Sequence, residues 1–319
     1  MEPLVSVCLA TYNHENFIAK TLDSILGQQG DFGIEILVHD DASTDQTASI
    51  VREYHRRYPE IIKPIYQKEN QYQKGIAIDP TFNYPRAIGK YIALCEGDDW
   101  WCDVRKLEKQ VSVMEKNPEI TFLFSNARVR NQGEAREERV FFPYRASEKT
   151  LGLDKARSFT LGEQCKINFA PTATFIFPRK VLSKLPTTYN EHHCAHGDLK
   201  LRMFMTAAGI AYYLPDVTSV YREEVPNSAM QRWAKENSVH ACHRAKEILQ
   251  MLDDVDAFSK RKYHHDISEL KKWYAYVMIF NAPNLDILQN KDAQYTFKTL
   301  SMGKRIRFYA KHLLKKIKK

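Results

Sequence analysis

The sequence predicts an α/β domain with a mostly parallel sheet, and three observations lead to this prediction. Short apolar runs of strand length alternate with amphipathic helical segments through the first hundred residues. Polar and acidic residues follow directly after apolar runs, at 11–13, 40–41 and 96–99. Beyond residue 227 the spacing of apolar residues is helical to the end of the chain. We therefore expect a Rossmann-like sheet flanked by helices, with right-handed crossovers and a helical C-terminal extension.

The individual elements follow from the apolar spacing in chain order. Strands are expected at 4–10, 34–39, 61–67, 91–95, 120–124, 172–177 and 211–214. Helices are expected at 15–28, 45–58, 80–89, 103–117 and 199–208, and from 227 onward with an interruption near Pro283. Ser43 or Thr44 is placed to cap the second helix. Residues 125–170 have a weaker pattern, which indicates loops and a short helix.

Composition narrows the class of protein. With 319 residues, 44% of them hydrophobic, the chain can build one large domain or two smaller ones. No apolar run reaches the length of about 18 residues that a membrane span needs, and the start of the sequence does not resemble a secretory signal. The six cysteines show no Cys-x-x-Cys spacing, which favours reduced thiols in a cytosolic protein.

An acidic cluster, Glu96-Gly97-Asp98-Asp99, follows the strand expected at 91–95. Carboxylates this close repel one another, so the arrangement usually persists where a cation or a catalytic demand rewards it. Asp98 and Asp99 can hold a hard divalent cation that keeps sites open for phosphate oxygens. The alternative is that the acids cap the next helix, a role for which Asp103 is the better candidate.

Two further features bear on ligand binding. Asp41, after the second strand, can accept hydrogen bonds from a base N–H or a ribose hydroxyl, although capping by Asp45 or Thr44 competes for this segment. Trp100 and Trp101 can stack on a sugar ring of an acceptor, and one of the two is expected in the core. Gly-rich phosphate loops are missing, so a nucleotide here would be bound by carboxylates and a metal.

Four ordered segments together resemble the family 2 glycosyltransferases of bacterial surface-polysaccharide synthesis, which have the GT-A fold. They run from Val5 to Asn13, from Val38 to Asp45, from Gly89 to Ile92 and from Glu96 to Trp100. The resemblance implies an inverting, Mn²⁺- or Mg²⁺-dependent transfer from a nucleotide-sugar donor to a glycan or lipid-linked acceptor. It implies a catalytic domain over 1–225, with a donor half at 1–125 and an acceptor half at 126–225, followed by a helical region at 226–319.

The same resemblance assigns roles to residues of this sequence. Thr11, Tyr12 and Asp41 would contact the nucleoside, and Lys74 or Asn83 would approach the diphosphate. Glu96, Asp98 and Asp99 would bind ribose, diphosphate and the metal, although Glu96 stands where the family has Asp.

The second half of the chain would supply the remaining groups. The motif His196-Gly197-Asp198 makes Asp198 the expected catalytic base, which takes the proton of the acceptor hydroxyl; the alternative is a helix N-cap. Arg222 would reach the diphosphate, or it is an ordinary surface arginine.

Residues 303–319 carry eight cations and no acid, which equals the formal excess of the whole chain. As a helix they place Ile306, Ala310, Leu313, Leu314 and Ile317 on one face, with Phe308 as the exception. Basic amphipathic helices bind anionic membranes, so we expect a peripheral enzyme at the cytoplasmic face of the inner membrane. The alternative is a helix packed on the domain; nucleic-acid binding is not expected.

Two other functions stay open from the sequence. A sugar nucleotidyltransferase also uses an α/β sheet and a carboxylate-bound metal, and a membrane-associated scaffold would keep the fold without the chemistry.

Overall fold

The computed structural model describes residues 2–131, 138–223, 225, 228–235 and 237–317. Contacts divide the chain into two compact units. The first unit comprises Met1–Pro186 and Leu201–Val225, and the second comprises Thr187–Lys200 and Pro226–Lys319. The sequence places Thr187–Lys200 in the acceptor half, but its contacts group this segment with the C-terminal helices.

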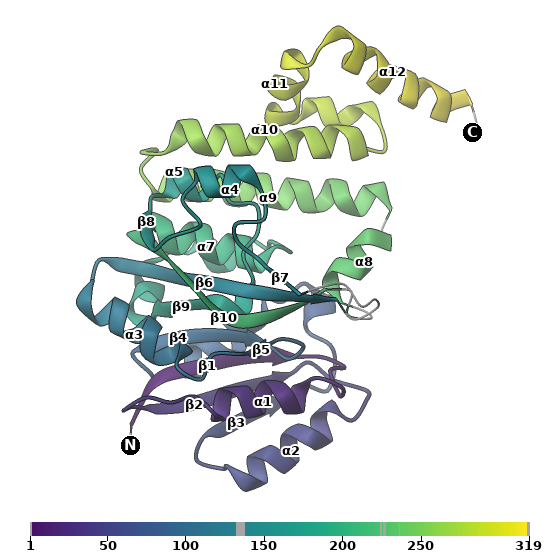
Figure 1. The fold of residues 1–319 in the computed structure, drawn as a ribbon. Coiled ribbons are helices and arrows are strands. Elements are labelled where there is room, and N and C mark those ends of the chain that lie inside the picture. The colour runs from purple at the N-terminus through teal and green to yellow at the C-terminus, as the bar shows by residue number, and fades with distance from the viewer. Residues whose placement is uncertain (1, 132–137, 224, 226–227, 236, 318–319) are drawn as a thin grey trace. The chain divides into compact units, whose positions relative to one another are not determined.

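The first unit is built on one sheet with the strand order β3-β2-β1-β4-β9-β6-β10-β5, with β7 paired to β6 and β8 paired to β10 (Figure 1). The strands are β1 (Pro3–Thr11), β2 (Gly33–Asp40), β3 (Ile62–Tyr66), β4 (Tyr91–Glu96), β5 (Trp100–Trp101), β6 (Ile120–Asn131), β7 (Arg139–Val140), β8 (Arg157–Phe159), β9 (Phe175–Pro178) and β10 (Ile210–Glu223). Strands β3, β2, β1 and β4 are parallel, as expected. Strand β9 runs antiparallel between β4 and β6.

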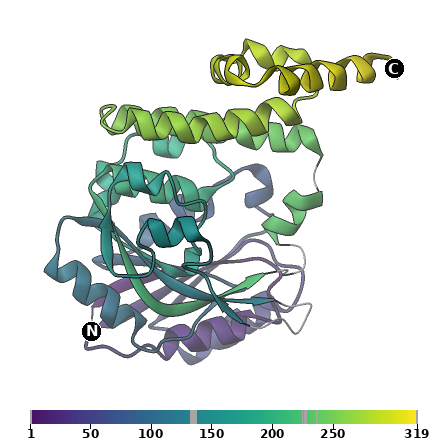
Figure 2. The same cartoon turned by 45° about the horizontal axis from the view of Figure 1, so that its top comes forward.

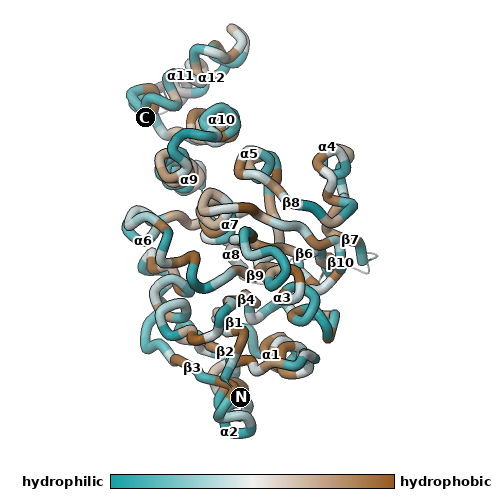
Figure 3. Tube along the Cα trace, turned by 90° about the vertical axis from the view of Figure 1, so that its left-hand side faces the viewer, coloured by the Kyte–Doolittle hydropathy of each residue, from teal (hydrophilic) through white to brown (hydrophobic). Residues whose placement is uncertain are grey.

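Helices flank this sheet in the first unit. They are α1 (Ile18–Leu26), α2 (Thr47–Arg57), α3 (Lys106–Lys116), α4 (Ala146–Thr150) and α5 (Leu161–Gln164), together with most of α7 (Gly197–Ala207). The side of α1 that carries Ile18, Leu22 and Ile25 is fully buried against the strands. Hydrophobic and hydrophilic residues accordingly alternate along this helix (Figure 3), which is the pattern of a helix with one buried face.

Two local expectations are wrong. Residues 80–89 do not form an α-helix: a π turn at Asp79–Asn83 leads into a 3-10 turn at Tyr84–Arg86. Pro85 explains this, because proline has no N–H for an α-helical bond and disfavours the helical conformation of the residue before it. The second helix is not capped by Ser43 or Thr44; Asp45 instead accepts the Thr47 backbone N–H at 2.9 Å.

A buried carboxylate joins the strands at the edge opposite the acidic cluster. Glu35 of β2 accepts hydrogen bonds from Ser6 of β1 at 2.6 Å and from the backbone of Ile88 at 2.9 Å. Gly89 lies so close that a Cβ there would come within 2.6 Å of the Ser6 backbone nitrogen. The glycine of the Gly89–Ile92 motif therefore has a packing reason in this fold.

The second unit is helical. It contains α6 (Thr188–Glu191), the start of α7, α8 (Ala229–Lys235), α9 (Ser238–Phe258), α10 (His264–Asn281), α11 (Lys291–Thr299) and α12 (Met302–Ile317). Helices α9 and α10 lie side by side (Figure 2), and a cluster that includes Leu249, Ile279 and Phe308 forms the core. Among the described helices, none is long and apolar enough to cross a membrane.

Candidate active site

The ends of three parallel strands meet at one edge of the sheet. Thr11 of β1 pairs with Asp40 of β2, and Ala10 pairs with Glu96 of β4. Just beyond the strands, Gly97 donates its backbone N–H to Ala10 at 2.9 Å and Asp41 donates to Thr11 at 3.0 Å. The loops that follow β1, β2 and β4 therefore converge, as expected for ligand sites at the carboxyl ends of parallel strands.

Glycine is required within the acidic cluster. A Cβ on Gly97 would lie 2.7 Å from His14 Nδ1 and would also collide with the Thr11 side chain. The loop after β1 and the loop after β4 are thus in direct contact, with Thr11 Oγ1 and His14 Nδ1 themselves 3.2 Å apart. Any larger residue at position 97 would push these two loops apart.

Asp99 is the buried member of the cluster. Its side chain is 1% exposed, and Oδ1 accepts the backbone N–H of Arg222 in β10 at 2.9 Å. Oδ2 has no hydrogen-bond partner among the described residues. Burial, followed by the negative charges of Asp98 and Glu96, raises the pKa of Asp99 well above its ordinary value. The hydrogen bond from Arg222 and its positive charge lower the pKa of Asp99 but do not outweigh these effects.

Asp98 and Glu96 are more accessible. The side chain of Asp98 is 17% exposed, and its Oδ2 lies 3.9 Å from His14 Nε2. The backbone oxygen of Asp98 accepts a hydrogen bond from the guanidinium of Arg222. Glu96, the position that differs from the family pattern, is exposed at the end of β4.

The donor set fits a divalent cation. Asp98 and Asp99 supply adjacent carboxylates, and the buried oxygen of Asp99 that lacks a partner is one that a cation would satisfy. Within the described residues, no group of three or more His, Cys, Asp or Glu side chains is placed to hold a metal. Mg²⁺ and similar ions are commonly held by one or two carboxylates, with substrate phosphates and water as the other ligands.

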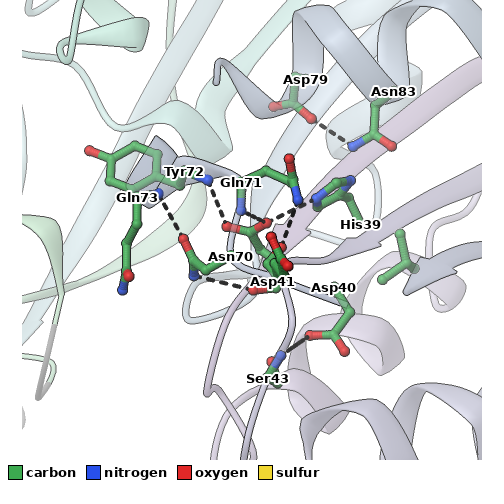
Figure 4. A network of polar contacts seen from close by, with 12 residues as sticks. His39, Asp40, Asp41, Ser43, Asn70, Gln71, Tyr72, Gln73, Asp79 and Asn83 are labelled. Carbon is green, nitrogen blue, oxygen red and sulfur yellow. Dashed lines mark hydrogen bonds and ion pairs between the residues drawn. The ribbon is translucent and has the colours of Figure 1, made fainter. Parts of the chain in front are cut away.

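Asp41 organises the loop that follows β3 (Figure 4). Its Oδ1 accepts the backbone N–H of Gln71 at 2.7 Å, and its Oδ2 accepts that of Tyr72 at 3.0 Å. Burial alone would raise the pKa of Asp41, but hydrogen bonds from His39, Gln71 and Tyr72 outweigh it and lower the pKa. The side chain is 4% exposed. Asp41 therefore fixes the segment around 70–74 over the end of β2.

The two candidates for the diphosphate differ in their surroundings. Lys74 is half-exposed at the end of that same loop and forms an ion pair with Glu69. Asn83 is fully buried, where its amide donates to Asp79 at 2.7 Å and accepts from Arg86 at 2.7 Å. The loop thus brings Lys74 to the surface, whereas both polar atoms of Asn83 serve the packing beneath it.

The structure also shows where the two tryptophans and the two residues at the end of β1 lie. Trp100 and Trp101 are 7% and 3% exposed, and Trp101 donates its indole N–H to Ala173 at 2.9 Å. The sequence predicts that one of the two rings lies in the core, whereas the structure buries both. Thr11 is buried beside the acidic cluster, and Tyr12 is partly exposed in the following loop.

Asp198 lies in the second unit, in the first turn of α7 and partly exposed. The residues before it are fastened to α9: His193 pairs with Glu247 at 2.9 Å, and the backbone of Ala195 donates to the same carboxylate at 3.0 Å. His192 likewise contacts Asp254 at 2.6 Å. These contacts anchor the segment that precedes Asp198 to α9.

Sequence reasoning missed His14, which contacts both Thr11 and Asp98. Its position three residues after Thr11, in a loop at a strand end, was the available signal. It also missed Arg86, which donates to the backbone oxygens of Val38 at 2.9 Å and Lys63 at 2.7 Å. No pattern in the sequence marks a partly buried arginine that ties two strands together.

Comparison with known proteins identifies relatives that match part of this chain. An uncharacterised protein of Mycobacterium tuberculosis is 37% identical over 159 residues, which are 49% of this chain and 44% of that protein. The putative teichuronic acid biosynthesis glycosyltransferase TuaG of Bacillus subtilis is 36% identical, over 38% of this chain and 46% of its own length. The Escherichia coli enzyme WfgD, a UDP-Glc:alpha-D-GlcNAc-diphosphoundecaprenol beta-1,3-glucosyltransferase, is 34% identical over 40% and 47%. The matched segment spans less than half of each of these relatives.

Solved structures share the fold. S. aureus TarS 1-349 in complex with UDP-GlcNAc superposes with a TM-score of 0.62 at 16% identity, covering 95% of this chain and 78% of that one. The mannosyltransferase PcManGT from Pyrobaculum calidifontis, in complex with GDP-Man and Mn²⁺, gives 0.54 at 18% identity, covering 97% and 84%. The expected GT-A fold is confirmed. The model of "Glycosyl transferase family 2" matches residues 6–185, more than half of the sequence, and the chain belongs to that family.

Proposed function

We propose that this chain is a metal-dependent inverting glycosyltransferase that moves a sugar from a nucleotide-diphosphate sugar to a glycan or lipid-linked acceptor during cell-surface polysaccharide synthesis. The observation that carries the proposal is the buried Asp99 oxygen, which has no hydrogen-bond partner among the residues that the structure describes and lies beside Asp98, where three strand ends meet. TarS and PcManGT, which share the fold, were solved with nucleotide sugars. Of the relatives, TuaG is assigned to teichuronic acid biosynthesis, and WfgD acts on a sugar linked to diphosphoundecaprenol.

Asp98 and Asp99 would hold the cation, Mn²⁺ or Mg²⁺, together with diphosphate oxygens of the donor. When bound, such a cation offsets the charge of the departing diphosphate. Arg222 would add a fixed positive charge, since its guanidinium already lies against the Asp98 backbone. Glu96, exposed at the rim, would contact the ribose.

Asp41 would act on the nucleoside side of the site. Each carboxylate oxygen has two lone pairs, so the two backbone hydrogen bonds that Asp41 accepts leave capacity for a base N–H. By holding residues 71 and 72, Asp41 would also shape the wall of the nucleoside site, with Thr11 and Tyr12 on the opposite loop. Lys74 follows the segment that Asp41 holds, and it would approach the diphosphate by giving up its ion pair with Glu69.

Asp198 would be the base. An inverting displacement needs a carboxylate that takes the proton from the acceptor hydroxyl as that oxygen attacks the anomeric carbon, while the bond to the diphosphate breaks. The support for Asp198 is its motif and its partial exposure at the start of α7. The ion pairs between residues 192–195 and α9 would hold the preceding segment still, which favours a positioned base.

Helix α12 would bind the cytoplasmic face of the inner membrane. It packs on its own unit through Phe308, which is fully buried beside Phe297 at a ring distance of 5.1 Å. Met302, Ile306 and Tyr309, spaced as one helical face, are 78%, 57% and 43% exposed.

The exposed face of α12 supports the membrane proposal, because Ile306, a member of the predicted apolar stripe, is exposed, whereas Phe308, which lies outside that stripe, is buried against the unit. Each lysine or arginine near an anionic surface adds about 1 kcal/mol of attraction, and Lys304, Arg305 and Arg307 lie in the described part of this helix. The side chains of Leu313, Leu314 and Ile317 lie outside the described residues.

The direct test is release of nucleoside diphosphate. UDP-, GDP- and dTDP-sugars would each be incubated with the protein, Mn²⁺ and a polyprenyl-diphosphate-linked sugar in phosphatidylglycerol vesicles. We expect acceptor-dependent release from one donor. Pyrophosphate release from a nucleoside triphosphate and a sugar phosphate would instead identify a nucleotidyltransferase, and no turnover with any donor would favour a scaffold.

A further inference from the structure

Three cations surround one buried aromatic ring next to the acidic cluster. Lys20 Nζ lies 3.8 Å from the ring centroid of Trp100, Arg222 Cζ lies 4.1 Å from it, and Arg130 Cζ lies 5.9 Å from it. They come from α1, β10 and β6, three segments far apart in the sequence. Trp100 itself is 7% exposed, so its ring is buried and contacts all three cations.

Two of these cations come from neighbouring positions on adjacent strands. Arg130 and Arg222 are paired residues in the register of the parallel strands β6 and β10. Like charges on neighbouring strand positions are destabilising. Cation–π contacts with the buried ring of Trp100 offset part of this repulsion, but they leave the positive charge of the group in place. The fold therefore tolerates a concentration of positive charge that packing alone does not explain.

Nearby acids neutralise only part of the group. Asp98 and Asp99 offset the charge of Arg222, but neither Lys20 nor Arg130 forms an ion pair with a residue that the structure describes. Glu138, the acid that acts on Lys20, is bound to Arg128 at 3.5 Å. Burial, followed by the charges of Arg222 and Arg130, lowers the pKa of Lys20.

We infer that Lys20, Arg130 and Arg222 form a phosphate-binding site over Trp100 that works without a metal. A phosphate or diphosphate group carries enough negative charge to offset several cations, and arginine guanidinium groups match its oxygens with paired N–H donors. The site adjoins the proposed donor site, because the Arg222 guanidinium also contacts the backbone of Asp98. Its ligand is the diphosphate of the donor or a phosphate group of the acceptor.

The test is calorimetric titration with inorganic pyrophosphate in EDTA, which removes any contribution of a divalent cation. The double variant Lys20→Gln/Arg130→Gln is compared with Arg56→Gln/Lys116→Gln, which removes the same two residue types from exposed positions on α2 and α3. We expect wild type and the α2/α3 variant to bind alike, and the Lys20/Arg130 variant to bind at least about tenfold more weakly. Equal affinity of all three proteins, or no binding by wild type, overturns the inference.

A second arm identifies the source of the phosphate. If the Lys20/Arg130 variant binds UDP or GDP with Mn²⁺ as tightly as wild type does, the site serves the acceptor; if that affinity falls in parallel with pyrophosphate, it serves the donor. Unchanged thermal unfolding of the variant, whose two substituted side chains are exposed, establishes that the fold is intact. The EDTA titration involves neither metal nor sugar, so its failure is distinguishable from a failure of the proposed transferase function.

Discussion

Asp99 accepts the backbone N–H of Arg222 at 2.9 Å, so the acidic cluster after β4 is fastened to strand β10. The two residues are 123 positions apart in the sequence. One oxygen of the carboxylate is used for this structural bond, and the other has no hydrogen-bond partner among the described residues. Asp99 thus has a structural role in the fold as well as a place in the proposed metal site. It differs in this from Asp98, which is more exposed.

This double role predicts different results for two substitutions of Asp99. Asn retains an acceptor for the Arg222 N–H, whereas Ala leaves that buried donor unpaired, which costs about 1–3 kcal/mol. We expect Asp99→Asn to unfold near the wild-type denaturant midpoint and Asp99→Ala to be less stable by that amount. Both should lose Mn²⁺-dependent nucleotide binding. Equal destabilisation by the two substitutions would show that the bond to Arg222 does not matter.

Asp198→Asn tests the proposed base. The amide cannot take a proton from the acceptor hydroxyl, so turnover should fall roughly 10²- to 10⁴-fold while calorimetric affinity for the nucleoside diphosphate stays the same. Asp154→Asn, an exposed position in the first unit, is the matched control and should leave both unchanged. Full turnover by Asp198→Asn would assign the residue to helix capping.

Glu35 predicts a pH dependence of stability. Burial would raise its pKa, but hydrogen bonds from Ile88, Ser6 and Lys63 outweigh burial and lower it. A carboxyl group whose pKa is lower in the folded state stabilises the protein above the pKa of the unfolded chain, about 4.3, and this contribution disappears as the pH falls through the folded value. Glu35→Gln should therefore cost about 2 kcal/mol at pH 7 and progressively less toward pH 3.

Urea unfolding across this pH range measures the difference. Glu60→Gln, an exposed position just before β3, is the control and should change little. A Glu35→Gln difference that stays constant from neutral to acidic pH would contradict the assignment.

Helix α12 predicts membrane binding through its exposed apolar face. Ile306→Ser with Tyr309→Ser should reduce co-sedimentation with phosphatidylglycerol vesicles by about tenfold or more, because these side chains would no longer transfer apolar surface from water. Val104→Ser with Tyr144→Ser removes exposed apolar side chains from the first unit and should have little effect. High salt should weaken binding of the wild type. If both double variants bind the vesicles equally well, helix α12 packs within its own unit and does not bind the membrane through this face.

The sequence predicted the parallel half of the sheet well, because each buried strand there is a continuous apolar run followed by a polar turn. The polar residues that follow these runs, among them Thr11, Asp41 and Glu96, lie at the strand ends that the fold brings together. It did not predict that β6 continues to Asn131 or that β10 runs from Ile210 to Glu223, since charged residues such as Arg128 and Arg130 alternate with the apolar ones there. Pairing between distant strands, which local patterns do not encode, decides these cases.

The site shows the same limit. Carboxylate clusters are visible in a sequence because their members are adjacent. The bond from Arg222 to Asp99 and the grouping of Lys20, Arg130 and Arg222 around Trp100 depend on strand order. Such long-range groupings appear only when the fold is known.

The most direct test of the proposed function is the contribution of Asp98 to metal-dependent donor binding. Asp98 is the accessible carboxylate of the pair, and among the described residues its side chain makes only a 3.9 Å contact with His14, so Asp98→Ala should fold normally. Titration of UDP and GDP by calorimetry should show binding by wild type that needs Mn²⁺ and weakens at least about tenfold in EDTA or in Asp98→Ala. Equal affinity with and without Mn²⁺, or in Asp98→Ala and wild type, would contradict the proposed site.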